Sequence, residues 1–147
     1  MKTPLMAVVP SLLLFLTLFG CSGSAPTATP APEHDAEAEP IARTEFTDRV
    51  ENFFEYEPLH AGKPSQFRIH LTDLSDGSPV ENADVVLVVR PKRGTGAASE
   101  TKAKVGKVTG IYVAELNIPQ SGEYDIEFRI KNAKLDERMP LSDFEVE

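Results

Sequence analysis

The chain has 147 residues, a hydrophobic content of 41% and a formal net charge of −8. This length and composition fit one globular domain with attachments rather than general disorder. An acidic surface repels nucleic-acid phosphates, so no nucleic-acid partner is expected.

The first predicted element, residues 1–20, is an export signal. Lys2 supplies a charged start, and residues 5–19 form an apolar stretch that is too short for a permanent membrane span. Export normally leads to an oxidising compartment where cysteines pair. The chain has a single cysteine, Cys21, so no internal disulfide can form.

The sequence Leu18-Phe19-Gly20-Cys21 resembles the lipobox of bacterial lipoproteins. The resemblance implies cleavage before Cys21 and lipid, palmitate included, on the new N-terminal residue; two or more acyl chains hold a protein durably at a membrane. Ser22 follows, and by resemblance to the sorting pattern of Gram-negative lipoproteins it implies an outer-membrane anchor with the domain facing the periplasm. An ordinary cleaved signal followed by a free thiol is the alternative.

Residues 21–40 are predicted to be a disordered tether that begins with the lipidated cysteine. Its prolines stand among Ala, Thr, Ser and Glu residues, a composition that disfavours a stable helix. No large apolar side chain is available to bury. The folded domain is therefore expected over residues 41–147.

The folded part is predicted to be all-β. In residues 66–72 and 124–131, apolar and polar side chains alternate with a period of two, as in strands with one dry and one solvated face. Residues 85–89 are continuously apolar, which predicts a strand that is central in its sheet or covered on both sides. Further strands are expected at residues 50–56, 102–105, 111–118 and 144–146.

About seven short strands with turns between them predict an immunoglobulin-like antiparallel β-sandwich, and no helix of ordinary length is expected. The chain lacks Trp and a Cys pair, so it is not an antibody-type domain with an inter-sheet disulfide. Tyr124 is expected to bury its ring at a strand corner and to satisfy its hydroxyl on nearby backbone.

Three segments resemble a known family. Thr44 to Val80 is similar to the N-terminal domain of heavy-metal-efflux periplasmic adaptors of the RND type, and residues 110–130 and 139–147 are similar to the rest of that domain, a relative of the YtkA-like sandwich. In the family, a lipoyl-like domain, a helical hairpin and a barrel follow. Here the sequence stops at Glu147, so a bridging function between pump and channel is not expected.

Three side chains in the domain are candidate metal ligands: His60, His70 and Met139. His60 lies in a predicted turn and His70 about seven strand residues beyond Lys63, on the order of 20 Å along the chain, so these two are not expected to share an ion. Met139 is a soft ligand without a visible partner, and the Cys21 thiol is expected to carry lipid. A copper or zinc carrier is therefore the second hypothesis, and no metal or cofactor is expected.

No catalytic constellation is recognisable. The chain has three His, and no Ser or Cys lies in a nucleophile-elbow context. Residues 94–99, GTGAAS, lack the third glycine of a dinucleotide loop and are predicted to be a hairpin loop. The basic cluster Arg90, Lys92 and Arg93 either meets an acidic partner or keeps a strand end solvated.

The sequence therefore predicts a non-catalytic cell-envelope lipoprotein whose sandwich docks another envelope protein, as an accessory to a heavy-metal or drug efflux system. Sheet edges and loop ends are the docking surfaces expected of such a fold. A glycan-binding surface module is the third hypothesis. It has little support, because Trp is absent and aromatic residues make up only 7% of the chain.

Overall fold

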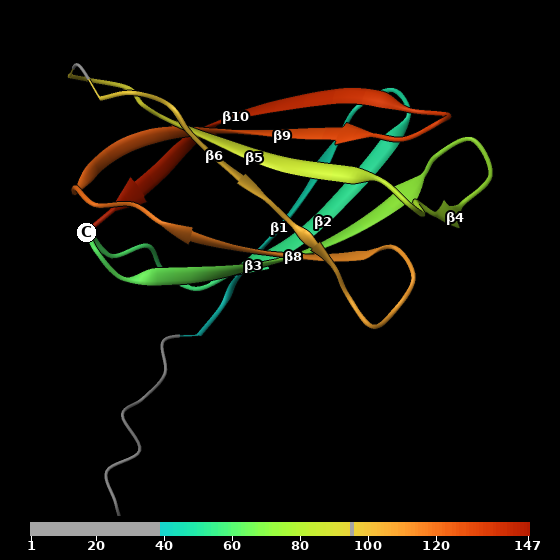
Figure 1. The fold of residues 1–147 in the computed structure, drawn as a ribbon, viewed down its shortest axis with the longest axis horizontal. Coiled ribbons are helices and arrows are strands. Elements are labelled where there is room, and N and C mark those ends of the chain that lie inside the picture. Colours follow the sequence, from blue (N-terminus) through green and yellow to red (C-terminus); the bar gives the residue numbers. More distant parts are fainter. Residues whose placement is uncertain (1–38, 95) are drawn as a thin grey trace, which may run out of the picture. The chain divides into compact units, whose positions relative to one another are not determined.

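A computed structural model describes residues 39–94 and 96–147. The predicted signal peptide, Cys21 and nearly all of the tether lie outside the described residues. The described part contains ten strands and no helix, arranged as two antiparallel sheets in two layers (Figure 1). The all-β sandwich prediction is confirmed. No helix of these residues has the length and apolar character that a membrane crossing would require.

The first sheet, called the β2–β3 sheet below, has the order β1 (Ile41–Phe46), β2 (Val50–Tyr56), β3 (Pro64–Asp73), β8 (Ile111–Asn117) and β7 (Lys104–Val105), with β4 (Ser78–Pro79) paired to β3. The second, called the β5–β9 sheet, has the order β10 (Asp136–Val146), β9 (Gly122–Lys131), β5 (Asp84–Pro91) and β6 (Ser99–Lys102). All strand pairings within the two sheets are antiparallel.

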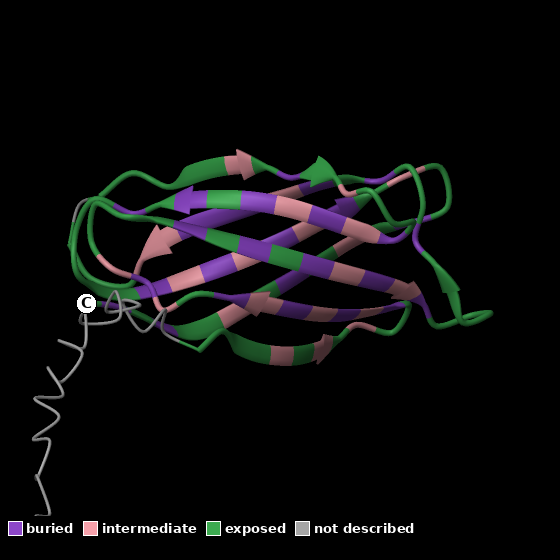
Figure 2. Cartoon of the chain, turned by 90° about the horizontal axis from the view of Figure 1, so that it is seen from below, coloured by how far each residue is buried: buried purple, intermediate pink, exposed green. Residues whose placement is uncertain are grey.

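The inner faces of both sheets supply the core. Buried and less buried residues alternate along the strands (Figure 2), because successive side chains of a strand point to opposite faces. Phe54 of β2 and Phe128 of β9 are fully buried, and their ring centroids lie 4.9 Å apart across the two layers. The inward residues predicted in segments 66–72 and 124–131 are all buried. The apolar segment 85–89 forms part of β5, which lies between β9 and β6 as predicted for a central strand.

Two buried tyrosines tie loops to this core. The Tyr124 hydroxyl donates to the carbonyl oxygen of Gln120 at 2.9 Å, which confirms the predicted role. The Tyr112 hydroxyl donates to the carbonyl oxygen of Val80 at 2.8 Å and accepts from the Ala83 amide at 3.1 Å. Each ring is therefore buried with its polar atom satisfied.

The structure contains strand segments that the sequence did not predict, including β4 and most of β6, and the largest differences are at β1 and β10. β1 was not predicted, because none of its residues is buried and it carries no alternating apolar signal. β10 was predicted only at residues 144–146 but begins at Asp136; Pro140 and a register shift between Leu141 and Phe144 interrupt its pattern.

The weak strand predicted at residues 102–105 is the junction of two strands. The chain leaves the β5–β9 sheet after β6 and enters the β2–β3 sheet at β7. Buried Ala103 lies between them, and its amide donates to the carbonyl oxygen of Val85 at 2.8 Å. This crossing joins the two layers along one side of the sandwich.

Candidate functional site

Charged side chains that neutralise one another cover the outer face of the β5–β9 sheet. Arg129 lies 2.8 Å from Glu100 and also pairs with Glu127, and this hydrogen bond from Arg129 holds the pKa of Glu127 below its ordinary value. This surface is called the paired face. Its outward residues are Asp84, Val86, Val88, Arg90, Glu100, Lys102, Glu123, Asp125, Glu127, Arg129, Lys131, Asp136, Arg138, Pro140 and Glu145. At its β10 edge like charges are opposed, Arg129 to Arg138 and Glu123 to Glu145.

The basic cluster predicted from the sequence belongs to the rim of the paired face. Its members pair with acidic side chains of β9: Arg90 with Glu127 at 3.8 Å, Lys92 with Asp125 at 4.0 Å, and Arg93 with Glu123 at 3.7 Å. Of the two roles predicted for this cluster, its internal pairing favours solvation of a strand end over recruitment of an acidic partner.

Val88, at the centre of the paired face, is shielded from solvent. It lies outside the hydrophobic core cluster, yet it is 0% exposed. Its neighbours across the strands are Glu127 on β9 and Glu100 on β6. These ion-paired side chains flank the valine on both sides, where the aliphatic stems of charged residues can shield apolar surface.

The outer face of the β2–β3 sheet is different. A row of directly opposed residues crosses four strands: Thr44, Phe53, His70 and Ile111. Phe53, His70 and Ile111 are half-buried although they point away from the core. This surface is called the Phe53 face. Its outward residues are Ala42, Thr44, Phe46, Glu51, Phe53, Glu55, Gln66, Arg68, His70, Thr72, Lys104, Ile111, Val113 and Glu115.

Charge does not cover the Phe53 face as it covers the paired face. Among its described residues the ion pair is Arg68 with Glu55, at the long distance of 3.9 Å. Half-buried Val113 lies opposite Arg68, and Phe46 at one corner is 62% exposed. The face therefore combines aromatic and aliphatic side chains with few charges, a composition typical of the centre of a protein interface.

His70 lies at the centre of this face. Its ring meets Phe53 edge-on, with centroids 5.4 Å apart and planes at 75°. Its Nε2 is buried and has no hydrogen-bond partner among the described residues. A buried polar atom without a partner costs free energy, which a hydrogen-bonding group brought by another molecule would recover.

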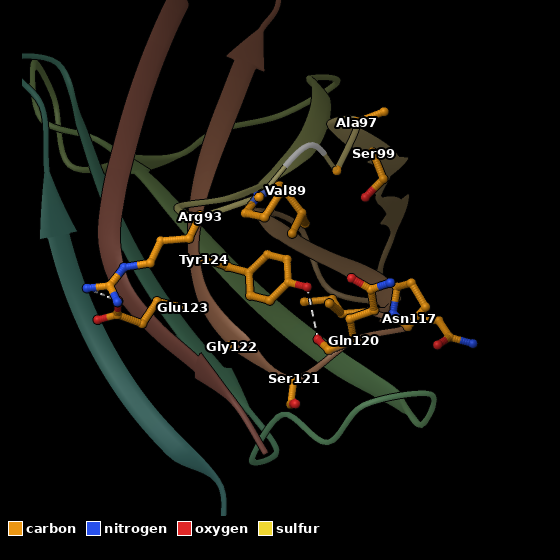
Figure 3. Close-up of a pocket in the computed structure, with 15 residues that line it drawn as sticks. Val89, Arg93, Ala97, Ser99, Asn117, Gln120, Ser121, Gly122, Glu123 and Tyr124 are labelled. Carbon is orange, nitrogen blue, oxygen red and sulfur yellow. Dashed lines mark hydrogen bonds and ion pairs between the residues drawn. The ribbon is translucent and has the colours of Figure 1, made fainter.

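A pocket of about 750 Å³ opens at one end of the sandwich, between the β5–β6 and β8–β9 loops (Figure 3). Tyr124 forms part of its wall, with the hydroxyl directed at the carbonyl oxygen of Gln120. Arg93 and Glu123 at the rim pair with each other. The described lining holds no His, Cys, Asp or Lys, and its carboxylate, Glu123, is the one paired with Arg93.

The three candidate metal ligands lie in different environments. His60 is in the loop between β2 and β3, with Nδ1 3.7 Å from Oε2 of Glu147. His70 is on the Phe53 face, and Met139 is buried in the core, where its sulfur accepts from Nδ2 of Asn52 at 3.7 Å. The fold does not bring the three together. Within residues 39–94 and 96–147, no group of three or more His, Cys, Asp or Glu side chains is placed to hold a metal ion.

Sequence reasoning missed Phe53 and Ile111 as candidate functional residues. The available signal was the pair Phe53-Phe54 inside a predicted strand. Because neighbouring strand residues point to opposite faces, one of the two rings had to lie on the outer surface. Phe54 occupies the core at 0% exposure, so Phe53 is the outer ring.

Comparison with known proteins gives one match. A family model described as YtkA-like matches residues 44–129, more than half of the chain. The matched segment runs from the middle of β1 into β9 and contains Phe53, His70 and Ile111. No curated protein and no solved structure matches the chain.

Proposed function

Because the chain belongs to the YtkA-like family, we propose that it is a non-catalytic binding module of the bacterial cell envelope. Lipid on Cys21 anchors it at the outer membrane facing the periplasm, and the Phe53 face docks another envelope protein. A component of a heavy-metal or drug efflux system is the partner favoured by the sequence resemblance.

One observation carries this proposal: the two outer faces of the sandwich differ in the charge pairing and burial of their outward residues. The paired face matches most of its charges internally, although Oδ1 of Asp125 has no hydrogen-bond partner among the described residues. The Phe53 face leaves Phe53, His70 and Ile111 half-buried, and within the same described residues Nε2 of His70 has no partner. Binding energy concentrates in aromatic anchors near the centre of an interface, surrounded by contacts that exclude water. Phe53 and its neighbours supply such a centre, and Glu55 and Arg68 supply a polar rim.

The two other hypotheses have less support. A copper or zinc carrier needs ligands that converge, and His60, His70 and Met139 lie on a loop, on an outer face and in the core. A glycan module needs an exposed aromatic platform, and the ring at the pocket, Tyr124, is 7% exposed.

Site-specific photocrosslinking in native membranes tests the docking proposal. Val113 on the Phe53 face and Val86 on the paired face are both half-buried valines on outer sheet faces, so a photoreactive side chain at each position gives a matched pair. We expect an adduct with one envelope protein from position 113, its loss in the Phe53→Ala variant, and no adduct from position 86. Equal adducts from both positions, or none from position 113, would contradict docking through this face.

The identity of the crosslinked protein tests the finer part of the proposal. Mass spectrometry of the position-113 adduct is expected to recover an efflux component. An adduct with an envelope protein of another system would retain the docking surface and overturn the efflux assignment. Cell-wall polymer in place of protein would favour the glycan hypothesis instead.

Lipidation is tested separately on the full chain. Labelled palmitate is expected to enter the wild-type protein and to be absent from Cys21→Ser, which is expected to leave the membrane fraction. Incorporation that survives Cys21→Ser would overturn the anchor. Copper(I) and zinc titration is expected to show no stoichiometric submicromolar binding; such binding, lost in His70→Ala, would favour the carrier hypothesis.

A further inference from the structure

The four sheet edges of the sandwich are not equally protected. The β10 edge carries Pro140 and an irregularity near Asp143, whose φ is 83°; β6 and β7 are short, with 4 and 2 residues. β1 pairs with β2 over all 6 of its residues without a register shift and contains no proline. Edge strands are normally blunted by proline, bulges, shortness or charge. Of these devices β1 has only charge.

The hairpin with β2 determines which backbone amide and carbonyl groups of β1 point away from the sheet. The amide of Thr47 donates to the carbonyl oxygen of Val50 at 2.9 Å, which closes the hairpin. Hydrogen-bonded pairs alternate along an antiparallel ladder, so the backbone groups of residues 41, 43 and 45 point to β2. Those of Ala42, Thr44 and Phe46 point away from the sheet, and all three residues are exposed.

We propose that this edge pairs with β1 of a second copy of the chain, antiparallel, with Thr44 opposite Thr44 on the two-fold axis. In this register Ala42 lies opposite Phe46 of the second copy. All three outward residues of each strand then form hydrogen-bonded pairs, about six backbone hydrogen bonds in total. The contact is isologous, as expected for a dimer with two-fold symmetry.

Charge selects this register. With Thr44 on the axis, Arg43 lies opposite Glu45 of the second copy, and the symmetric contact repeats the pair. A shift by two residues places either Arg43 opposite Arg43 or Glu45 opposite Glu45, and directly opposed like charges are unfavourable. A shift by one residue opposes outward and inward backbone groups, which breaks the ladder.

Charge also selects the partner. Arg43 and Glu45 are half-buried, and Arg43 is fixed by Glu45 at 2.6 Å and by Asp143 at 3.2 Å, with its guanidinium 5.0 Å from the centroid of Phe144. Inward charges on an edge strand obstruct pairing with a strand that cannot match them. A second copy supplies the opposite charge at each position. The edge therefore rejects a general partner strand and accepts its own sequence.

The geometry has a consequence for the Phe53 face. The two-fold axis of an antiparallel strand pair is perpendicular to the sheet, so the Phe53 faces of both copies point the same way and form one continuous surface. The pairing rests on β1 alone, so it can be tested whether or not that surface docks another protein.

A cysteine on the axis tests the proposal in native membranes. Directly opposed hydrogen-bonded residues have Cα atoms about 5.5 Å apart, within the disulfide range of about 4.4–6.8 Å. The full chain with Thr44→Cys is expected to form a disulfide-linked homodimer that a reducing agent separates into monomers. Ala42→Cys is the control: it is equally outward and exposed, but the two cysteines are offset by four residues, about 13 Å. Equal dimer yields from both variants would mean random collision and would overturn the register.

Two further variants separate pairing from folding. Thr44→Pro removes an amide that points away from β2, so the fold and its melting temperature are expected to stay unchanged while the detergent-solubilised chain becomes monomeric by light scattering. In the Thr44→Cys background, Arg43→Glu is expected to reduce the disulfide dimer at least fivefold, and adding Glu45→Arg is expected to restore it. A wild-type chain that is monomeric at all concentrations, or a Thr44→Pro dimer, would contradict the proposal.

Discussion

The two outer faces of this sandwich belong to sheets of six and four strands, and they differ in how their apolar residues are shielded from solvent. The paired face covers its apolar centre with its own ion-paired side chains, so that Val88 is 0% exposed. The Phe53 face holds an aromatic and aliphatic row of half-buried residues, and within the described part of the chain Arg68–Glu55 is the ion pair at its side. A face closed by its own charges gains little from a partner, whereas an uncovered apolar row gains free energy when another surface excludes water from it.

The centres of the two faces show the difference most clearly. Val88 is apolar and lies between Glu100 and Glu127, while Oδ1 of Asp125 further along β9 has no hydrogen-bond partner among the described residues. His70 is polar, packs edge-on against Phe53 and leaves Nε2 unpaired. An unpartnered buried atom does not by itself separate the two faces, because Asp125 on the paired face and Asn52 in the core each have one. What distinguishes the Phe53 face is its half-buried row of Phe53, His70 and Ile111.

The largest expected effect on the free energy of unfolding comes from placing a charge at Val88, the buried centre of the paired face. Val88→Asp would bury a carboxylate between Glu100 and Glu127, and we expect it to lower the free energy of unfolding by about 3–5 kcal/mol, measured by urea denaturation. Val113→Asp on the Phe53 face is the matched control, because that valine is half-buried opposite Arg68. Its expected loss is about 1 kcal/mol or less. Equal losses at both positions would remove the distinction between the faces.

The next largest expected effect is a pH-dependent loss of stability when an ion pair of the paired face is removed. Arg129 lowers the pKa of Glu127, so the folded state favours the ionised carboxylate. This contribution is present above the unfolded pKa of about 4.3 and is lost as pH falls through the lower folded pKa. Glu127→Gln is expected to cost about 1 kcal/mol at pH 7, since Arg129 is partly exposed and solvent screens the pair. The gap between wild type and variant is expected to close below about pH 4 in unfolding curves; a gap that widens on acidification would contradict the assignment.

Much of the fold could be predicted because burial leaves a signal in the sequence. In β3 and β9 the alternation of apolar and polar residues identified the strands and their inward sides, and Tyr124 was expected at its corner with its hydroxyl bonded to backbone. β1 gave no such signal, since an edge strand without buried residues needs no apolar alternation. β10 was shortened in prediction by Pro140, which an edge strand tolerates.

The candidate site was harder to predict for a physical reason. A docking surface is defined by which outward residues become neighbours, and that depends on strand order. Phe53 and Ile111 are 58 residues apart in sequence and lie on either side of His70 because β2 and β8 both flank β3. His70 was singled out as a candidate metal ligand, and its neighbours instead are a phenylalanine ring and an isoleucine.

An effect of similar size and opposite sign is expected at the centre of the Phe53 face. His70→Phe keeps an aromatic ring beside Phe53 and removes the unpaired Nε2. We therefore expect the free energy of unfolding to rise by about 1 kcal/mol. The same variant is expected to weaken the position-113 crosslink, because the partner loses a hydrogen-bonding group. A variant that is less stable than wild type would show that Nε2 is satisfied in solution, and the explanation of the face would then lose part of its support.

The smallest expected effect compares one Arg–Glu pair on each face. Arg129 and Glu100 lie 2.8 Å apart within a network that includes Glu127, whereas Arg68 and Glu55 lie 3.9 Å apart on their own. Double-mutant cycles to alanine are expected to give a coupling of about 0.5–1 kcal/mol for the first pair and about 0.2 kcal/mol or less for the second. Added salt is expected to shrink the first coupling, since both partners are partly exposed. A coupling at Arg68–Glu55 as large as at Arg129–Glu100 would mean that the Phe53 face is also closed by its charges, and that the half-buried row needs another explanation.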